Sequence, residues 1–300
     1  MAWSADDIPD QRGRVALVTG ANSGLGFETA RALCRKGAVV LLACRDPERA
    51  ERACRQLATE GRGTPEVLSL DLADLRSVRA ASTDVQRRHG HLDLLINNAG
   101  VMALPRQLSV DGLERQFATN HLGHFALTLA LLPLLRMRPG SRVVTVTSGA
   151  QHFGRIAFED LQGERHYDRW RAYAQSKLAN TMFALELQQR LDGSGTLSLA
   201  AHPGVARTQL QPSSVAASGT RLEGMAYRLM DPLFQSAAAG ALPQLFAATA
   251  AGLTGGELVA PGGPGELRGA PGRGRLPAVA LRPEPRARLW RISEELCGHA

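Results

Sequence analysis

The sequence predicts an α/β protein with a single doubly wound parallel sheet and helices on both faces of that sheet. Short apolar runs typical of buried strands alternate with segments of helical periodicity along most of the 300 residues. The first apolar run ends in a glycine-rich turn that opens a helix, an order found where parallel sheets bind ligands. No internal repeat is visible, so we expect one domain over residues 1–300 with its core in 12–260.

The predicted elements follow one another in a regular order. Strands are expected at 14–19, 39–44, 67–70, 94–96, 142–146, 197–201 and 257–260. Helices are expected at 27–35, 47–60, 75–88, 111–129, 173–187, 236–251 and 289–296, with Asp111 as an N-cap. The irregular segment 205–235 is expected to form a small substrate lid. Residues 261–285 hold six Gly, six Pro and four Arg, so we expect 261–300 to be a loop followed by a C-terminal helix.

The composition excludes several classes of protein. Hydrophobic residues make up 44% and charged residues 21%, which is ordinary for a globular chain with a sizeable core. The net charge is +7, but aromatics are only 5% and no basic block alternates with them, so nucleic-acid binding is not expected. The four cysteines form no C-x-x-C pair, which predicts reduced thiols in the cytoplasm. No secretory signal is visible, and the longest apolar run, 125–135, is too short to span a bilayer.

The turn after the first strand predicts a dinucleotide site. Glycines at 20, 24 and 26 give the pattern T-G-x-x-x-G-x-G between a strand and a helix, where backbone N–H groups can meet a phosphate. Gly20 and Gly24 permit the tight turn, and Gly26 lets the helix pack closely on the strand. The turn residues expected to bind the cofactor are Gly20, Asn22, Ser23, Gly24, Leu25 and Gly26.

The end of the second strand bears on which dinucleotide binds. In such folds a carboxylate near this position holds the ribose 2′-hydroxyl, whereas an arginine accommodates a 2′-phosphate. Here Cys44 ends the strand and Arg45 follows it, so NADP(H) is preferred over NAD(H). Asp46 leaves two alternatives open: its carboxylate could reach the ribose instead, or Arg45 and Asp46 could be a solvated loop pair.

A tyrosine and a lysine four residues apart predict acid–base chemistry. The chain has only two lysines, and one of them, Lys177, follows Tyr173 at helical spacing, so the two side chains would share a helix face. A nearby cation favours the phenolate, which makes the phenol usable as a proton donor and acceptor near neutral pH. The Y-x-x-x-K pattern alone is common, but Ser148 stands at the end of an earlier strand and supports a site.

Polar residues at other strand ends and in the long helix extend the candidate site. The fourth strand ends in Asn97-Asn98-Ala99-Gly100, at the sheet edge where ligands of open α/β folds lie. Asn120 is an amide in a mostly apolar helix and must find partners if it is buried. His121 and His124 lack a third ligand nearby in the sequence, so zinc is discounted and no metal is expected.

Together these motifs resemble the short-chain dehydrogenase/reductase family, whose fold is of the Rossmann type. The resemblance runs from about Arg12 to Leu296. The motifs stand in the family's order: Thr19-Gly20-x-x-x-Gly24-x-Gly26, Asp71, Asn97-Asn98-Ala99-Gly100, Asn120, Ser148, Tyr173-x-x-x-Lys177 and Pro203-Gly204. Ala43-Cys44-Arg45, the segment from Asn120 to Phe125 and the C-terminal helix are most similar to the retinol-dehydrogenase-like and WW-domain-oxidoreductase-like subgroup.

The resemblance implies a role for each matching residue. Tyr173 would be the catalytic acid/base, and Lys177 would lower its pKa and hold the nicotinamide ribose. Ser148 would polarise the substrate oxygen, and Asn120 would position a water in a proton relay. The residues that the resemblance adds to the cofactor site are Asp71 and Leu72 at the adenine, Asn98, Ala99 and Gly100 along the cleft, and Pro203, Gly204 and Thr208 near the nicotinamide.

The sequence therefore predicts an NADP(H)-dependent oxidoreductase that transfers a hydride between nicotinamide and a carbonyl or alcohol of a small, apolar substrate. The alternative is a non-catalytic NADP(H)-binding regulatory or scaffold protein. The retention of Ser148, Tyr173 and Lys177 argues against that alternative. Whether the protein forms a homo-oligomer is left open.

Overall fold

The computed structural model describes residues 2–206, 215 and 234–298. The strands are β1 (Val15–Thr19), β2 (Val39–Cys44), β3 (Thr64–Ser69), β4 (Leu94–Asn97), β5 (Arg142–Val146), β6 (Leu197–Ala201), β7 (Leu258–Pro261) and β8 (Pro271–Arg273). The α-helices are α1 (Gly24–Arg35), α2 (Pro47–Glu60), α3 (Leu75–Arg88), α4 (Arg115–Phe117), α5 (Gly123–Arg136), α6 (Arg169–Arg190), α9 (Ala237–Thr249) and α10 (Pro283–Leu296). A π-helical turn, η2 (Ala118–Leu122), joins α4 to α5, and short 3-10 turns lie at η1 (Ala5–Asp7), η3 (Gly149–Phe153), η5 (Pro264–Glu266) and η6 (Ala278–Leu281).

The strands form one eight-stranded sheet in the order β3-β2-β1-β4-β5-β6-β7-β8. All neighbours are parallel except β7 and β8. The winding reverses between β1 and β4, where Leu17 is in register with Leu41 on one side and Leu95 on the other. Loops leave the carboxyl ends of these strands in opposite directions, and the crevice between such loops is where doubly wound sheets bind ligands.

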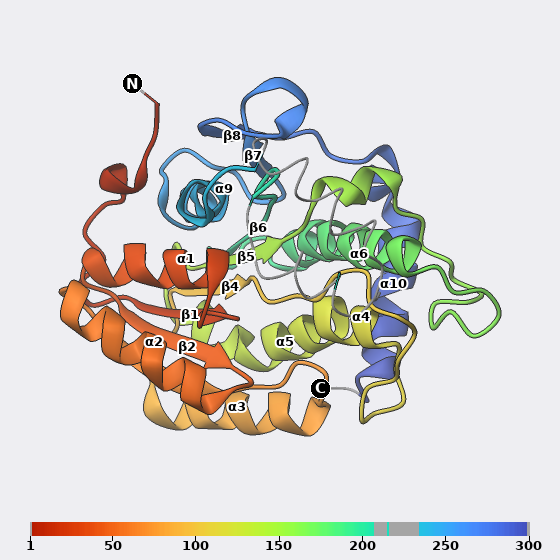
Figure 1. Ribbon diagram of the computed structural model, residues 1–300, viewed down its shortest axis with the longest axis horizontal. Helices are drawn as coiled ribbons and strands as arrows, with labels where there is room; N and C mark the ends of the chain where they lie inside the picture. The colour runs from red at the N-terminus through yellow and green to blue at the C-terminus, as the bar shows by residue number, and fades with distance from the viewer. Residues whose placement is uncertain (1, 207–214, 216–233, 299–300) are drawn as a thin grey trace.

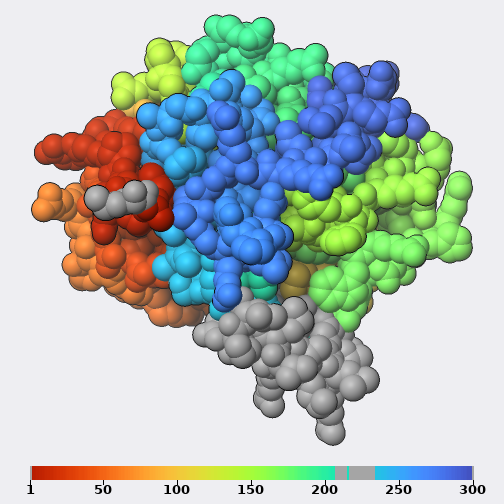
Figure 2. Space-filling view, turned by 90° about the horizontal axis from the view of Figure 1, so that it is seen from above, coloured from red at the N-terminus to blue at the C-terminus, as the bar shows by residue number. Residues whose placement is uncertain are grey.

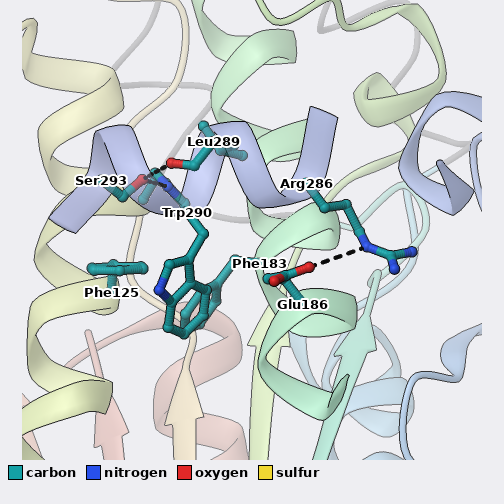
Figure 3. Close-up of a pocket in the computed structure, with 8 residues that line it drawn as sticks. Phe125, Phe183, Glu186, Arg286, Leu289, Trp290 and Ser293 are labelled. Carbon is teal, nitrogen blue, oxygen red and sulfur yellow. Dashed lines mark hydrogen bonds and ion pairs between the residues drawn. The ribbon is translucent and has the colours of Figure 1, made fainter. Parts of the chain in front are cut away.

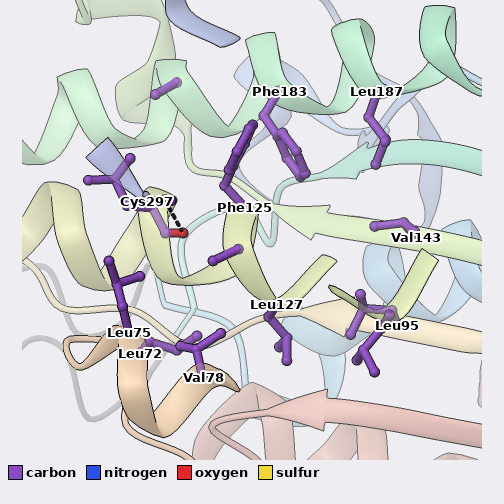
Figure 4. Close-up of a cluster of buried hydrophobic side chains, with 14 of the residues drawn as sticks. Leu72, Leu75, Val78, Leu95, Phe125, Leu127, Val143, Phe183, Leu187 and Cys297 are labelled. Carbon is purple, nitrogen blue, oxygen red and sulfur yellow. Dashed lines mark hydrogen bonds between the residues drawn. The ribbon is translucent and has the colours of Figure 1, made fainter. Parts of the chain in front are cut away.

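Two helical layers cover the sheet (Figure 1). One hydrophobic cluster joins the sheet to α1, α2 and α9, and the other joins it to α3, α5, α6 and α10. Side chains alternate along each strand, so that Leu17 faces the second cluster and Val18 the first. Figure 4 shows the second cluster, in which the rings of Phe125 from α5 and Phe183 from α6 pack against each other. The predicted doubly wound sheet is confirmed.

Two element predictions were wrong. No helix begins at Asp111, whose carboxylate instead accepts the backbone N–H of Leu75 at 3.0 Å. The helix starts later, at α4, with Glu114 as its N-cap. Residues 261–285 are also more than a loop, because β8 adds an antiparallel edge strand to the sheet.

The C-terminal part of the chain lies at one end of the sheet. Figure 2 shows the chain from residue 234 onward in blue, and this part forms the middle of the face seen in that view. Most of the predicted substrate lid, 205–235, lies outside the described residues. Among the helices that are described, none has the length and apolar character needed to cross a membrane.

Candidate active site

The glycine turn between β1 and α1 forms an open cradle. Gly20 and Gly24 adopt φ of +68° and +55°, in the left-handed region that favours glycine. A Cβ on Gly26 would lie 2.3 Å from the Gly20 carbonyl oxygen, so only glycine lets α1 start this close to the strand. A Cβ on Gly24 would meet nothing within 4 Å. The N-terminus of α1 thus faces free space, which fits a dinucleotide phosphate.

The end of β1 is tied to the end of β4. The Thr19 hydroxyl accepts the backbone N–H groups of Asn98 and Ala99, each at 2.9 Å. The Asn98 side chain donates to the Thr19 carbonyl at 2.8 Å. These bonds fix both walls of the crevice at the switch point. Asn97, by contrast, is fully buried and donates to Thr128, so its side chain supports the fold.

Tyr173 and Lys177 lie on the buried face of α6, beside the end of β5. The Lys177 ammonium donates to the Val146 carbonyl at 3.3 Å and lies 5.9 Å from the centre of the Tyr173 ring. The Thr147 hydroxyl donates back to the Lys177 carbonyl at 2.7 Å. The next residue, Ser148, is half-buried and caps η3 by accepting the Ala150 N–H at 3.3 Å. The end of β5 is therefore bonded directly to the helix that carries the tyrosine.

Lys177 is the most perturbed cation of the candidate site. Its side chain is buried, and the loss of water lowers its pKa to about 8. No carboxylate of the described residues forms an ion pair with it. A lysine in this setting can exchange protons near neutral pH.

Asn120 is fully buried in η2 and is held on both sides. Its side-chain oxygen accepts the Val101 N–H at 2.8 Å, and its amide donates to Val101 O and to Ser176 Oγ, each at 2.9 Å. A Cβ on Gly100 would lie 3.1 Å from Asn120 Oδ1 and 3.3 Å from Lys177 Nζ. Gly100, Asn120 and Lys177 therefore converge. π-Turns within helices often occur at functional sites.

Arg45 and Asp46 separate into different roles. Asp46 is the N-cap of α2: its carboxylate accepts the Arg49 N–H at 3.0 Å and pairs with the Arg49 guanidinium at 3.5 Å. Arg45 is exposed and forms no ion pair with any described residue. The thiol of Cys44 accepts N–H groups from Ala21 and Asn22 in the glycine turn, which places the end of β2 beside the cofactor cradle. Burial raises the pKa of this thiol to about 11.

The structure describes all but one of the remaining predicted cofactor residues. Asp71 accepts the Ala73 N–H at 2.9 Å, and Leu72 is buried against η2 and α5. Gly204 adopts a φ of +69° in the loop after β6, and the Pro203 carbonyl accepts the Gln235 amide at 2.6 Å. Thr208 lies outside the described residues.

Two buried histidines beside the candidate site were not assigned roles from the sequence. His124 contacts Thr19 and Asn120. His202 accepts the Gly204 N–H on Nδ1 at 3.0 Å, while its Nε2 lies 3.3 Å from the Glu266 carboxylate. Glu266 thereby joins the Gly/Pro/Arg-rich segment to the loop after β6. The i,i+4 spacing of Asn120 and His124 was the one available signal for the contact between these two residues.

Among the described residues, no group of three or more His, Cys, Asp or Glu side chains could hold a metal.

The fold, the glycine cradle and the Tyr173–Lys177 pair define a nicotinamide-dependent oxidoreductase class, and comparison with known proteins gives the family. The family model of the short chain dehydrogenases matches residues 14–218. The chain belongs to the short-chain dehydrogenase/reductase family, in its retinol-dehydrogenase-like subgroup. The resemblance inferred from the motifs is confirmed.

Curated relatives in this subgroup are similar over most of the chain. Human retinol dehydrogenase 12 is 43% identical over 242 residues, which cover 80% of this chain and 75% of that protein. Mouse retinol dehydrogenase 11 is 48% identical over 199 residues. Those residues cover 66% of this chain and 63% of the relative.

Solved structures share the fold. An uncharacterized protein from Mycobacterium paratuberculosis is 42% identical, with a TM-score of 0.82 and coverage of 99% of this chain and 98% of the other. A protein from Beutenbergia cavernae, described as an NAD(P)-dependent gluconate 5-dehydrogenase with NADP bound at low occupancy, is 25% identical with a TM-score of 0.67. It covers 83% of this chain and 96% of its own.

Proposed function

We propose that this protein is an NADP(H)-dependent reductase or dehydrogenase that interconverts a carbonyl and an alcohol on a small, apolar substrate. The observation that carries the proposal is the convergence of Lys177, Asn120 and Gly100 beside the end of β5. That point lies on the same edge of the sheet as the glycine cradle. A nicotinamide dinucleotide held by the cradle supplies or accepts the hydride.

The side chains divide the proton chemistry among them. The Tyr173 hydroxyl gives its proton to the carbonyl oxygen during reduction and takes it back during oxidation. Ser148 Oγ donates a hydrogen bond to the same oxygen and stabilises the charge that develops there. The Lys177 ammonium favours the deprotonated form of the phenol. Asn120 positions a water that connects Lys177 to solvent. Cytoplasmic localisation remains a prediction from the sequence.

The preference for NADP(H) rests on Arg45. Its guanidinium is exposed at the end of β2 and is available for a 2′-phosphate, whereas the Asp46 carboxylate is engaged at the start of α2. The strand end itself carries Cys44 and so presents no carboxylate that would repel the phosphate. NADP is bound in the structure from Beutenbergia cavernae, which is described as NAD(P)-dependent, so the fold can accommodate a 2′-phosphate.

An apolar substrate is supported by the relatives and by the surface near Ser148. Two relatives are named as retinol dehydrogenases, and retinol is a long, apolar primary alcohol. Phe153, five residues after Ser148, is 88% exposed in η3, and Trp170 is 41% exposed at the start of α6. Met225, which the sequence also placed at the pocket, lies outside the described residues.

The non-catalytic alternative is less favoured because Ser148, Tyr173 and Lys177 are all present. Lys177 alone could be kept to hold the nicotinamide ribose. A chain that only bound the cofactor would not need both the Ser148 hydroxyl and the Tyr173 phenol beside it.

Loss of nicotinamide absorbance with a panel of apolar aldehydes and ketones tests the proposal. We expect turnover with NADPH and a KM for NADPH raised about tenfold or more in Arg45→Ser, since a charge-assisted phosphate contact is lost. The KM for NADH should not change, and Arg49→Ser serves as the matched control. A preference of the wild type for NADH would overturn the assignment of Arg45. Tight NADPH binding without turnover on any compound would favour the non-catalytic alternative.

A further inference from the structure

His124 is a fully buried histidine at the second residue of α5, one turn after Asn120. Its Nδ1 lies 3.0 Å from the Asn120 carbonyl oxygen and its Nε2 lies 2.9 Å from the Thr19 hydroxyl. Burial lowers the pKa of the ring to about 4, and the nearby Lys177 ammonium acts in the same direction. The imidazole is therefore neutral at physiological pH, with one N–H and one lone pair.

The hydrogen bonds allow one tautomer. The Asn120 carbonyl can only accept, so the ring proton must be on Nδ1. Nε2 then carries the lone pair and accepts the Thr19 hydroxyl proton at 2.9 Å, a shorter contact than the 3.4 Å from Thr19 Oγ1 to the Ile96 carbonyl. The reverse tautomer would place the Nδ1 lone pair against the carbonyl. It would also give the Thr19 oxygen a third donor besides the N–H groups of Asn98 and Ala99.

This tautomer orients a continuous chain of hydrogen bonds. The N–H groups of Asn98 and Ala99 donate to Thr19, Thr19 donates to His124, and His124 donates to Asn120. The chain starts in the loop after β4 at the cofactor crevice and ends at the amide residue of the proton relay. The Ile96 carbonyl is a second acceptor for the Asn98 N–H at 2.9 Å and for the Thr19 hydroxyl at 3.4 Å. Because neighbouring hydrogen bonds polarise one another, we expect a change at Thr19 to alter the bond between His124 and Asn120.

His121 provides an internal comparison. It is equally buried and only three residues away, but its Nε2 bonds to Ser293 in α10 at 2.9 Å, away from the strand ends. Its ring packs against Phe117 and Phe183 instead. Within the same turn of helix, one histidine faces the candidate site and the other faces the C-terminal helix.

We propose that His124 is a positioning residue that links the cofactor loop at Asn98–Ala99 to Asn120, and so fixes the geometry of cofactor and proton relay together. The inference rests on the proposed function for its kinetic consequence, but its structural content does not depend on turnover. It assigns the Nδ1–H tautomer to His124, hydrogen-bonded at both nitrogens.

Nitrogen NMR of protein labelled in its eight histidines tests the assigned tautomer of His124 directly. The His124 ring signals are assigned by their loss in His124→Asn. We expect a neutral ring protonated on Nδ1 that does not titrate while the chain stays folded, and a shift of the Nε2 signal in Thr19→Val. A ring protonated on Nε2, or an imidazolium at neutral pH, would overturn the inference whether or not the protein shows activity.

Kinetics of three variants test the consequence. His124→Leu removes both bonds, and we expect kcat to fall and the dissociation constant of NADPH to rise, each by about ten- to a hundredfold, because buried partners are left unpaired. In His124→Asn the amide stands near Nδ1, and it should recover part of kcat. In His124→Gln the amide reaches the position of Nε2, and it should recover part of the NADPH affinity.

His121→Leu is the matched control. We expect it to lower thermal stability about as much as His124→Leu while leaving kcat and NADPH affinity near wild type. Equal kinetic losses in the two variants, or no rescue by either amide, would show that His124 only fills the core. A wild type without turnover would refute the proposed function, and the NMR result would still decide the tautomer.

Discussion

Two polar clusters flank α6, and they differ in how their charges are compensated. Toward the strand ends, the buried Lys177 ammonium donates to the Val146 backbone carbonyl, and Asn120 and Gly100 converge on it. Toward α10, the buried Glu186 carboxylate pairs with Arg286 at 3.6 Å (Figure 3). It also pairs with Arg190 of the same helix at 3.1 Å. Lys177 and Glu186 are both buried, so burial alone does not identify a functional residue. The uncompensated charge marks the candidate site, and the paired charges mark an inter-helix contact.

The largest expected effect is on turnover, and it comes from the cluster at the strand ends. Tyr173→Phe removes the hydroxyl and keeps the ring, so the fold should be retained while turnover falls about 10²–10⁴-fold. Steady-state rates and NADPH binding measured together separate the two effects. Unchanged turnover in a folded Phe variant would remove Tyr173 from the chemistry.

The α10 side should respond in stability and not in turnover. Trp290 is buried with its ring 4.8 Å from Phe125 and 5.8 Å from Phe183, and Arg190 lies 4.2 Å from its ring centre. Trp290→Ala should cost ~3–5 kcal/mol of unfolding free energy because it leaves a cavity. Urea unfolding measures the loss, and Leu281→Ala, at an exposed position, is the control. A variant that stays as stable as wild type would contradict the close packing of α10.

The uncompensated charge of Lys177 predicts a pH dependence of stability. Burial lowers its pKa from 10.5 to about 8 in the folded chain. Between these two values the unfolded chain binds more protons, so stability rises with pH across that window. The destabilisation caused by burying the charged Lys177 side chain is fully present below the folded-state pKa and amounts to ~3 kcal/mol.

Comparison with Lys177→Met isolates this contribution from those of other titrating groups. Urea unfolding at several pH values should show the unfolding free energy of the wild type increasing relative to that of the Met variant as the pH rises from 8 to 10.5. A constant difference between the two proteins would mean that Lys177 keeps an ordinary pKa in the folded chain.

A smaller effect tests the convergence at Gly100. Gly100→Ala places a methyl group 3.1 Å from Asn120 Oδ1 and 3.3 Å from Lys177 Nζ, so one of the two must move. We expect turnover to fall about tenfold, equivalent to ~1.4 kcal/mol, with little change in stability. Gly90→Ala, where the added methyl meets nothing within 4 Å, is the control. An equal response of the two variants would argue against a shared geometry of Asn120 and Lys177.

Local patterns were sufficient to predict the sheet and the core of the candidate site. Short apolar runs such as Val39–Cys44, each followed by a segment of helical spacing, indicated buried strands. The glycines of the T-G-x-x-x-G-x-G turn indicated the positive φ that Gly20 and Gly24 adopt. The i,i+4 spacing of Tyr173 and Lys177 was enough to predict that they share one face of a helix. The roles assigned to Ser148 and the cofactor residues stay predictions.

Features that depend on distant contacts could not be predicted. His124 and Thr19 are 105 residues apart in the sequence, so nothing local indicated their bond. The break at η2 was missed because apolar periodicity does not distinguish a π-turn from an α-turn. β8 was missed because Pro271 and Gly272 are typical of loops, although a proline is tolerated in an edge strand.

The two outermost strands have a consequence for self-association. β3 and β8 end the sheet, and each contains a proline, Pro65 and Pro271, that cannot donate to a further strand. Arg273 is exposed on β8, and Glu66 lies on β3. Prolines and charges at such positions discourage the addition of a strand from another molecule. The folded chain should therefore resist growing into extended aggregates through its sheet edges, even at high concentration.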